Sequence, residues 1–353
     1  MTFHHMLLRV AGWVPDELVS AARDWLARGY LVEVAQAVTF VALAHRIPVT
    51  PDDAACLRTA LSETGFDIDL LADLDIVELV GMPCFAMTPI YPGGHADRAD
   101  EMPYRLDLTS DGTQYGGLDE VDRAAVAAAK DDASGAPAVA GLWRAWRSPA
   151  LPTPWPAPRR LYLVQAVADD QEALPTLAAR LQRVLVQAGE DAPQVEVFTH
   201  LGDLPPYQRT ALGCSALLWT ARATTAIRIA ELFDPVDEVG GPGFAASRPT
   251  LDDRERDEVL AYLDAGSPLL TTTALMDDVM EDGHGVVPMS FRTDGQWIWT
   301  DAAAYYLRRY SLAPDATLLH HIRTRRYEIT PIDAVAQHRA LAALQAPTSG
   351  EDG

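Results

Sequence analysis

The sequence predicts an α/β protein with a helical N-terminal domain that includes a small hairpin. A Rossmann-like, mostly parallel α/β domain is expected to follow it and to end in a β-hairpin and two helices. Helix-start signals dominate the first part of the chain, and five prolines lie between Pro149 and Pro158. Beyond them, apolar stretches alternate with amphipathic ones. Apolar strands that alternate with helices are typical of a parallel sheet covered on both faces.

Helix starts are the clearest signals in the N-terminal part. Pro15-Asp16 and Pro51-Asp52 each combine a proline with an aspartate. Proline suits the first helical position, where its missing N–H is not needed, and aspartate meets the positive end of the helix dipole. Thr50 precedes the second pair and is a natural N-cap. We therefore expect helices over most of the first part of the chain.

Strand and turn signals follow between Gly81 and Tyr115. The stretch "YRLDLTSDGTQY" alternates apolar and polar residues around Asp111-Gly112, which predicts a hairpin. The alanine-rich stretch "LDEVDRAAVAAAK" then predicts a helix. The proline run is typical of a stiff, extended linker. The expected organisation is a domain at 1–148, a linker at 149–158, a Rossmann-like domain at 159–342 and a disordered tail at 343–353.

The second domain shows the strand and helix alternation most clearly. "RLYLVQAVA" reads as a strand, "QEALPTLAARLQRVLVQAG" as an amphipathic helix and "QVEVFTH" as a second strand. "LPPYQRTALGC" then predicts a short helix and "SALLWTA" a third strand. This strand–helix–strand order is similar to nucleoside-processing and TIR-like Rossmannoid domains. No catalytic glutamate in a diagnostic context accompanies it.

Composition and charge exclude several classes of partner. The formal net charge is −22 at pH 7, and Lys130 is the only lysine among 28 basic residues. Such a charge repels nucleic acids and anionic membranes, so neither is an expected partner. DNA mimicry is disfavoured because the acidic residues do not form long blocks.

Cysteine usage and the N-terminus point to the cytoplasm. Cys56, Cys84 and Cys214 are far apart and odd in number, which predicts neither a disulfide framework nor a CxxC metal pair. The first residues lack the basic and apolar regions of a signal peptide. The apolar stretch "YLVEVAQAVTFVALAHRI" contains Glu33 and reads as a buried helix rather than a membrane span.

Familiar catalytic motifs are missing from the sequence. There is no GxSxG elbow, and "GGPG" contains a proline where a phosphate loop needs an N–H group. The acidic stretch "MDDVMEDGHG" matches neither an EF-hand nor a helical zinc site. We therefore expect no metal and no cofactor, and whether the chain is an enzyme stays open.

An aromatic cluster, "RTDGQWIWTDAAAYYLRRY", contains a tight-turn signal at Asp294-Gly295. A two-residue turn there would pair Phe291 with Ile298 and place both on one face of a hairpin. The other face would carry Arg292, Trp297 and Trp299. These residues, with Tyr305, are candidates for a ligand-binding face, whereas helices over both faces would make the tryptophans part of the core. Packing is the favoured alternative because regularly spaced aromatic residues are most often core.

A basic island follows the aromatic cluster. Its candidate binding residues are Arg323, Arg325 and Arg326, and His320 and His321 lie beside them. Arginine forks suit phosphates or carboxylates. The favoured alternative is pairing with the acidic first domain or with a second subunit.

The expected strand ends supply an alternative site. Ligands of open parallel sheets lie at the carboxyl ends of strands. The residues that follow the three expected strands include Asp169, Asp170, His200, Asp203 and Arg222. Acids and a histidine in that position would suit ribose binding or glycosyl cleavage.

The segment "VVPMSFRTDGQWIWTDAAAYYLRRYSLAPDATLLHHIRTRRY" is similar to the C-terminal segment of uncharacterised hypothetical proteins from high-GC actinobacteria. That resemblance implies no activity. The leading hypothesis is a cytoplasmic, non-enzymatic binding or regulatory protein that acts through protein–protein contacts, with a protein partner or self-association. The alternative is a sensor or hydrolase for a nucleotide or nucleoside, which would use the strand-end loops. A small-molecule ligand is compatible with both.

Overall fold

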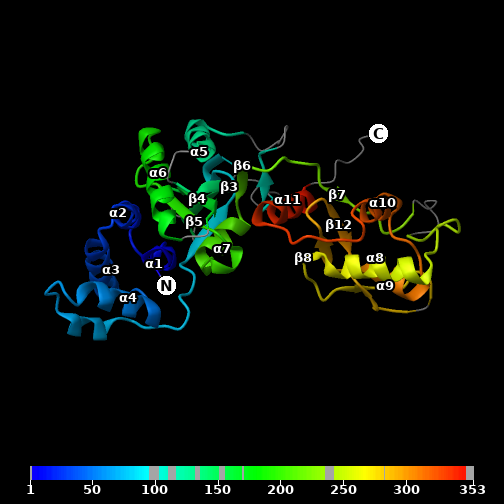
Figure 1. Ribbon diagram of the computed structural model, residues 1–353, viewed down its shortest axis with the longest axis horizontal. Coiled ribbons are helices and arrows are strands. Elements are labelled where there is room, and N and C mark those ends of the chain that lie inside the picture. Colours follow the sequence, from blue (N-terminus) through cyan, green and yellow to red (C-terminus); the bar gives the residue numbers. More distant parts are fainter. Residues whose placement is uncertain are drawn as a thin grey trace. The chain divides into compact units, whose positions relative to one another are not determined.

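A computed structural model describes residues 2–94, 103–109, 117–131, 136–150, 156–168, 171–234, 242–281 and 283–346. Contacts divide the chain into unit 1, Met1–Thr224, and unit 2, Thr225–Gly353 (Figure 1). Both units combine helices with a sheet that contains parallel strands, which confirms the α/β class. Within the described residues, no helix is long and apolar enough to cross a membrane.

Helices open unit 1, as expected from the sequence. They are α1 (Phe3–Val10), α2 (Asp16–Ala27), α3 (Leu31–His45), α4 (Pro51–Leu61) and the 3-10 helix η1 (Ile68–Asp73). Pro15 is the N-cap residue of α2. Thr50 forms a capping box with Asp53, whose N–H donates to the Thr50 hydroxyl over 3.2 Å. Both predicted helix starts are confirmed.

The sheet of unit 1 is mixed. Its strands are β1 (Phe85–Thr88), β2 (Leu106–Asp107), β3 (Ala138–Pro149), β4 (Arg159–Val167), β5 (Gln194–Phe198) and β6 (Ala216–Thr220). Their order is β2-β6-β3-β4-β5, and β1 pairs with β3. The pairs β4–β5 and β2–β6 are parallel, whereas β3 lies antiparallel between β4 and β6. The expected mostly parallel sheet therefore contains one strand of opposite direction.

The short connection between β3 and β4 explains why these two strands are antiparallel. We expected a domain boundary at 149–158, but the strands on its two sides, β3 and β4, are paired neighbours of one sheet. A parallel pair needs a crossover of about a dozen residues or more, usually with a helix, and this connection is shorter. The division between the two units falls instead after Thr224.

The predicted hairpin at 104–115 is only partly described. Its turn, Asp111-Gly112, lies outside the described residues. The described strand β2 pairs in parallel with β6, through Leu106 opposite Ala216. Its partner is therefore a strand far along the chain.

Helices cover both faces of this sheet. On one face, α5 (Glu120–Lys130) and α6 (Leu174–Gln187) pack on a core that includes Val195 and Val197 of β5. Glu196 lies between these valines and therefore points to the opposite face. There it meets α2 and α7 (Pro206–Gly213).

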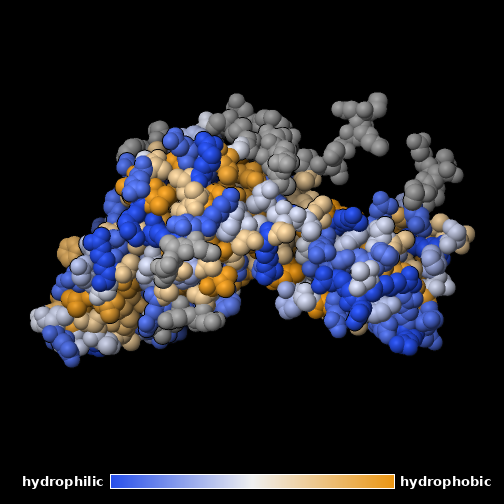
Figure 2. All heavy atoms as spheres, turned by 45° about the horizontal axis from the view of Figure 1, so that its top comes forward, coloured by the Kyte–Doolittle hydropathy of each residue, from blue (hydrophilic) through white to orange (hydrophobic). Residues whose placement is uncertain are grey.

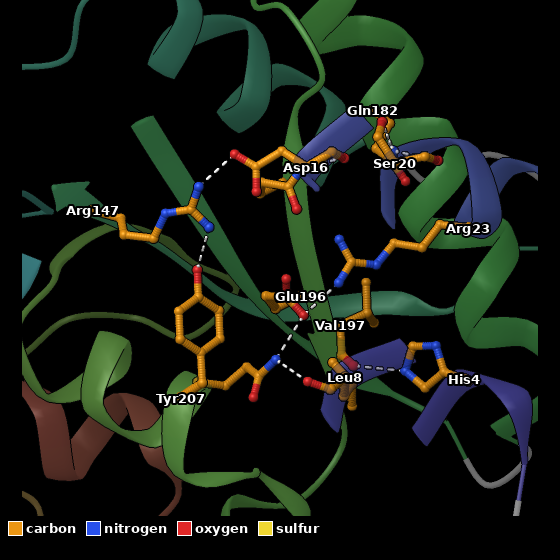
Figure 3. A network of polar contacts seen from close by, with 12 residues as sticks. His4, Leu8, Asp16, Ser20, Arg23, Arg147, Gln182, Glu196, Val197 and Tyr207 are labelled. Carbon is orange, nitrogen blue, oxygen red and sulfur yellow. Dashed lines mark hydrogen bonds and ion pairs between the residues drawn. The ribbon is translucent and has the colours of Figure 1, made fainter. Parts of the chain in front are cut away.

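A buried polar network joins the N-terminal helices to β5 (Figure 3). Arg23 of α2 donates to Glu196 over 2.6 Å, and the two side chains are 2% and 0% exposed. Gln208 of α7 donates to the same carboxylate oxygen over 3.0 Å and to the backbone oxygen of Leu8 over 2.7 Å. Three helices thus meet around one carboxylate.

The free edge of β5 is covered by the same helices. His4 of α1 donates through Nε2 to the backbone oxygen of Val197 over 2.8 Å. Gln194 donates to the backbone oxygen of Asp16 over 2.9 Å. Arg147 of β3 bridges the Asp16 carboxylate and the hydroxyl of Tyr207 (Figure 3). Covering an edge strand in this way prevents it from pairing with another chain.

Unit 2 is built around a second, four-stranded sheet in the order β7-β12-β11-β8. Its strands are β7 (Arg228–Ile229), β8 (Ser267–Leu270), β11 (Phe291–Thr293) and β12 (Trp297–Thr300), and β9 (Leu275–Met276) pairs separately with β10 (Val287–Pro288). The helices are α8 (Asp253–Ala265), α9 (Asp301–Tyr310), α10 (Ala316–Thr324) and α11 (Ala334–Gln345).

Three described helices follow the hairpin of unit 2, rather than the expected two. The additional helix is α11, whose N-cap Asp333 accepts a hydrogen bond from the N–H of Ala336. It includes residues 343–345 of the predicted disordered tail, and residues 347–353 lie outside the described part of the chain. Leu341 and Leu344 pack on the sheet core, which stabilises the helix there.

Replacing Glu196 with alanine is expected to destabilise unit 1 by about 3–5 kcal/mol, because Arg23 would remain buried without its carboxylate. The double substitution Arg23→Met with Glu196→Leu should recover most of this loss. The exposed pair Arg28–Asp24 provides the control: Asp24→Asn should cost less than about 1 kcal/mol. Urea denaturation followed by circular dichroism measures all three. Equal effects of Glu196→Ala and Asp24→Asn would contradict this reading.

Burial of His4 makes unit 1 sensitive to pH. Burial lowers the pKa of His4 from 6.5 to about 4, although the hydrogen bond to Val197 opposes this. Between pH 4 and pH 6.5, His4 therefore binds a proton in the unfolded chain but not in the folded chain. Above pH 6.5, His4 is neutral in both states and does not reduce the stability of unit 1. As the pH drops to 4, the free energy of unfolding should fall by roughly 3 kcal/mol.

His4→Gln retains a donor for Val197 and should flatten this pH profile, measured by urea denaturation between pH 4 and pH 7. His45→Gln is the control because His45 is exposed. An unchanged slope in His4→Gln would show that another group is responsible.

Candidate interaction surface

The two tryptophans of the aromatic cluster lie in the core. Trp297 is 5% exposed and Trp299 is 1% exposed. Both pack with residues of α8, α9 and α10 on one face of the unit 2 sheet. Ile298 points to the other face, where it packs against Ala340 of α11. Helices therefore cover both faces, which is the condition under which we expected the tryptophans to be structural.

The hairpin itself is confirmed with a shifted register. Thr293 pairs with Ile298 and Arg292 with Trp299, so the loop is two residues longer than the predicted turn. The Thr293 hydroxyl donates to the backbone oxygen of Trp297 over 2.6 Å, and Asp294 accepts from the N–H of Trp297 over 2.8 Å. These bonds stabilise the longer loop. A shift by two residues leaves every side chain on its predicted face.

The remaining candidates of the aromatic cluster have partners within unit 2. Arg292 donates to Asp301 over 2.6 Å and to the backbone oxygen of Gly266 over 3.0 Å. The hydroxyl of Tyr305 donates to Asp278 over 3.0 Å. These contacts hold both side chains in place, and their role in binding stays a prediction.

The basic island is partly paired with acidic residues. Arg323 forms two hydrogen bonds with Glu255 of α8, over 2.6 and 3.0 Å. Arg325 donates to the backbone oxygen of Glu328 and to Thr330. Arg326 is exposed and has a left-handed backbone with φ of 55°. Arg323 is therefore paired inside the chain, but with unit 2 itself rather than with the acidic first domain that the sequence predicts as its partner.

The strand-end candidates lie at one edge of the unit 1 sheet. His200 and Asp203 follow β5, and Arg222 follows β6; all three are exposed. Because β4 and β6 are both antiparallel to β3, the carboxyl ends of β4, β5 and β6 meet at the same edge. Asp169 and Asp170 follow β4 and lie outside the described residues. A ligand at this edge stays a prediction.

A different surface of unit 1 has the properties of an interaction site. It is formed by residues 67–82, which we call the acidic–apolar surface. Three buried side chains anchor it: Leu71, Leu74 and Val80 are 3%, 6% and 2% exposed. Its backbone is fixed by hydrogen bonds between Val49 and both Asp75 and Val77, each 3.0 Å long.

Large apolar side chains point outward between these anchors. Leu79 is 74% exposed, and four others are 36–46% exposed: Ile68, Leu70, Ile76 and Met82. Exposed carboxylates alternate with them: Asp67, Asp69, Asp73, Asp75 and Glu78. Figure 2 shows hydrophobic and hydrophilic residues side by side on the left, at the end of unit 1 that contains α3 and α4. Several large apolar side chains exposed in one segment are a feature of interaction sites.

The sequence contains a signal for this surface that helical periodicity does not capture. "FDIDLLADLDIVELVGM" alternates acidic and apolar residues, and no lysine or arginine occurs from Thr59 to Asp97. Acidic–apolar alternation is a known feature of interaction segments. We interpreted the first part of the chain only as helices, and helical periodicity does not report which apolar residues remain exposed.

Comparison with models of protein families, with curated proteins and with solved structures finds no match to this chain. Within the described residues, no group of three or more histidine, cysteine, aspartate or glutamate side chains is placed to hold a metal ion.

Close packing around Trp299 generates a test of its structural role. A Cβ atom on Gly266 would overlap the indole ring of Trp299 and approach Cβ of Arg292 to 3.2 Å. Gly266→Ala should therefore destabilise unit 2 by about 1–3 kcal/mol, measured by thermal denaturation. Gly202→Ala is the control because its Cβ atom would meet open space. If both variants melt like the parent protein, the indole is not confined as described.

Proposed function

We propose that this chain is a cytoplasmic, non-enzymatic binding or regulatory protein that acts through protein–protein contacts. The observation that carries the proposal is the acidic–apolar surface, in which outward apolar side chains alternate with carboxylates. Leu79, at 74% exposed, is its most exposed apolar residue. A protein interface buries such groups at its centre and surrounds them with polar contacts.

The charge of the surface specifies the kind of partner. Within the described part of the chain, no ion pair involves Asp67, Asp69, Asp73, Asp75 or Glu78. A complementary partner presents arginine or lysine beside apolar side chains, because opposite charges steer association and fix the register. We propose a basic amphipathic polypeptide segment as that partner.

The surface is held in place before a partner arrives. The buried side chains of Leu71, Leu74 and Val80 and the hydrogen bonds to Val49 order its backbone. A preorganised surface loses little conformational entropy on binding, so more of the contact energy appears as affinity. This supports a dedicated contact surface.

The cysteines support the proposed compartment. Cys56, Cys84 and Cys214 are all free thiols. Free thiols persist in reducing compartments such as the cytoplasm.

A nucleotide- or nucleoside-binding sensor or hydrolase is the second candidate. The observation in its favour is the unit β4–α6–β5, whose two strands are parallel and which is followed by His200 and Asp203 at a strand end. Such edges bind nucleotides in open α/β sheets. The acidic–apolar surface plays no part in this candidate.

Binding to a synthetic helical peptide of leucine and arginine tests the protein-contact proposal. Fluorescence anisotropy with the full chain should give saturable binding. Leu79→Ser and Ile76→Ser should each weaken it about ten-fold or more, because loss of a central apolar contact costs at least roughly 1.4 kcal/mol. A scrambled, non-amphipathic peptide of the same composition should bind weakly.

Two matched variants control for general effects. Val186 of α6 is 57% exposed and lies outside the surface, so Val186→Ser should leave the affinity unchanged. Asp73→Asn should weaken binding more than Asp253→Asn, which removes an exposed carboxylate of α8. If the Leu79→Ser and Val186→Ser variants bind the peptide with equal affinity, the peptide does not contact this surface.

A further inference from the structure

Unit 2 contains a pocket of about 530 Å³ between α10 and the strands β7 and β12. This volume lies within the roughly 300–1,000 Å³ that is typical of small-molecule sites. The side chains that matter here are Arg228, Trp297, His320 and His321. Its described lining contains no carboxylate, although the chain carries a net charge of −22. We propose that this pocket binds a small organic phosphate, independently of the acidic–apolar surface.

The basic side chains of the pocket are available to a ligand. Arg228 and His320 are exposed, and neither side chain pairs with an acid among the described residues. By contrast, Arg147 lines a pocket of about 490 Å³ in unit 1 but already pairs with Asp16. An unpaired guanidinium can form two parallel hydrogen bonds with a phosphate. Arg228 is therefore the principal anion contact.

The buried carboxylate of Asp294 fixes the orientation of the His321 ring in the wall of the pocket. Asp294 accepts hydrogen bonds from His321 Nε2 over 2.6 Å and from the Tyr262 hydroxyl over 2.5 Å. Its second oxygen accepts the backbone N–H groups of Gln296 and Trp297. Burial raises the pKa of Asp294, but these hydrogen bonds outweigh it and hold that pKa below its ordinary value.

The tautomer of His321 follows from this arrangement. An ionised carboxylate accepts hydrogen bonds and donates none, so Nε2 of His321 carries a proton. The Nδ1 atom is then an acceptor, which suits a hydroxyl group of the ligand rather than its phosphate. Arg228 and His320 supply polar groups from two elements, β7 and α10. Contacts from several directions suit the three oxygens of a phosphate group.

The wall of the pocket favours an organic phosphate over the inorganic ion. The guanidinium of Arg228 lies over the indole of Trp297, 5.6 Å from the ring centroid. The ring of His321 lies 6.1 Å from the same indole. Flat aromatic and cationic groups stack on planar ligand rings. A phosphate attached to a planar ring, as in a nucleoside monophosphate, therefore matches both the charge and the shape.

Isothermal titration of the full chain with adenosine monophosphate, adenosine and inorganic phosphate tests this site. We expect adenosine monophosphate to bind at one site, and adenosine and phosphate to bind about ten-fold more weakly or worse. Arg228→Gln and His320→Gln should each weaken binding of the monophosphate about ten-fold. Both side chains are exposed, so the substitutions leave the fold intact. Arg254→Gln, at an 89% exposed arginine of α8, should have no effect.

Three results would overturn the proposal. The first is failure of adenosine, guanosine and uridine monophosphates and of glucose 6-phosphate to bind. The second is equal affinity for adenosine and its monophosphate. The third is equal affinity of the Arg228→Gln and Arg254→Gln variants for adenosine monophosphate. If His200→Ala abolishes binding in that case, the ligand lies at the strand ends of unit 1. None of these results bears on the peptide experiment, whose variants lie in residues 67–82.

Discussion

The architecture of unit 1 depends on compensating the buried carboxylate of Glu196. An ionised group without solvent requires a partner, and Arg23 of α2 supplies it. Gln208 of α7 shares the same oxygen, and His4 of α1 binds the neighbouring backbone oxygen of β5. From α2 the packing continues through α3 and α4 to η1, at the start of the acidic–apolar surface. This ion pair is one of the buried contacts that attach to β5 the helical layer that presents this surface.

Local charge, rather than the net charge of −22, decides what each unit can bind. Within the described residues, the carboxylates of the acidic–apolar surface form no ion pair, whereas the lining of the unit 2 pocket contains Arg228 and His320 and no carboxylate. Because charge interactions in water are screened within about 10 Å, each site responds to its own neighbours. An acidic chain can therefore recognise both a basic polypeptide and an anion.

Local signals were predictable from the sequence, and long-range pairings were not. The N-cap at Thr50 and the face of each side chain in the hairpin depend on a few adjacent residues, and both are confirmed. The direction of β3 depends on which strands pair with it, which no local pattern records. The pocket joins Arg228 to His320, two residues far apart in the chain, so only the fold reveals it. Of the two tryptophans of the aromatic cluster, Trp297 lines this pocket and Trp299 does not.

The central position of β3 has a consequence for how the chain matures on the ribosome. Its neighbour β4 is synthesised soon after it, so this antiparallel pair can form early with little loss of loop-closure entropy. On its other edge, β1 precedes it in the chain and can pair with Trp146–Pro149, whereas β6 emerges only after α6, β5 and α7. Until then Gly141–Arg144 of β3 and the whole of β2 lack their partner strand. The nascent chain therefore passes through a stage with an open sheet edge, when aggregation and chaperone binding are most favourable.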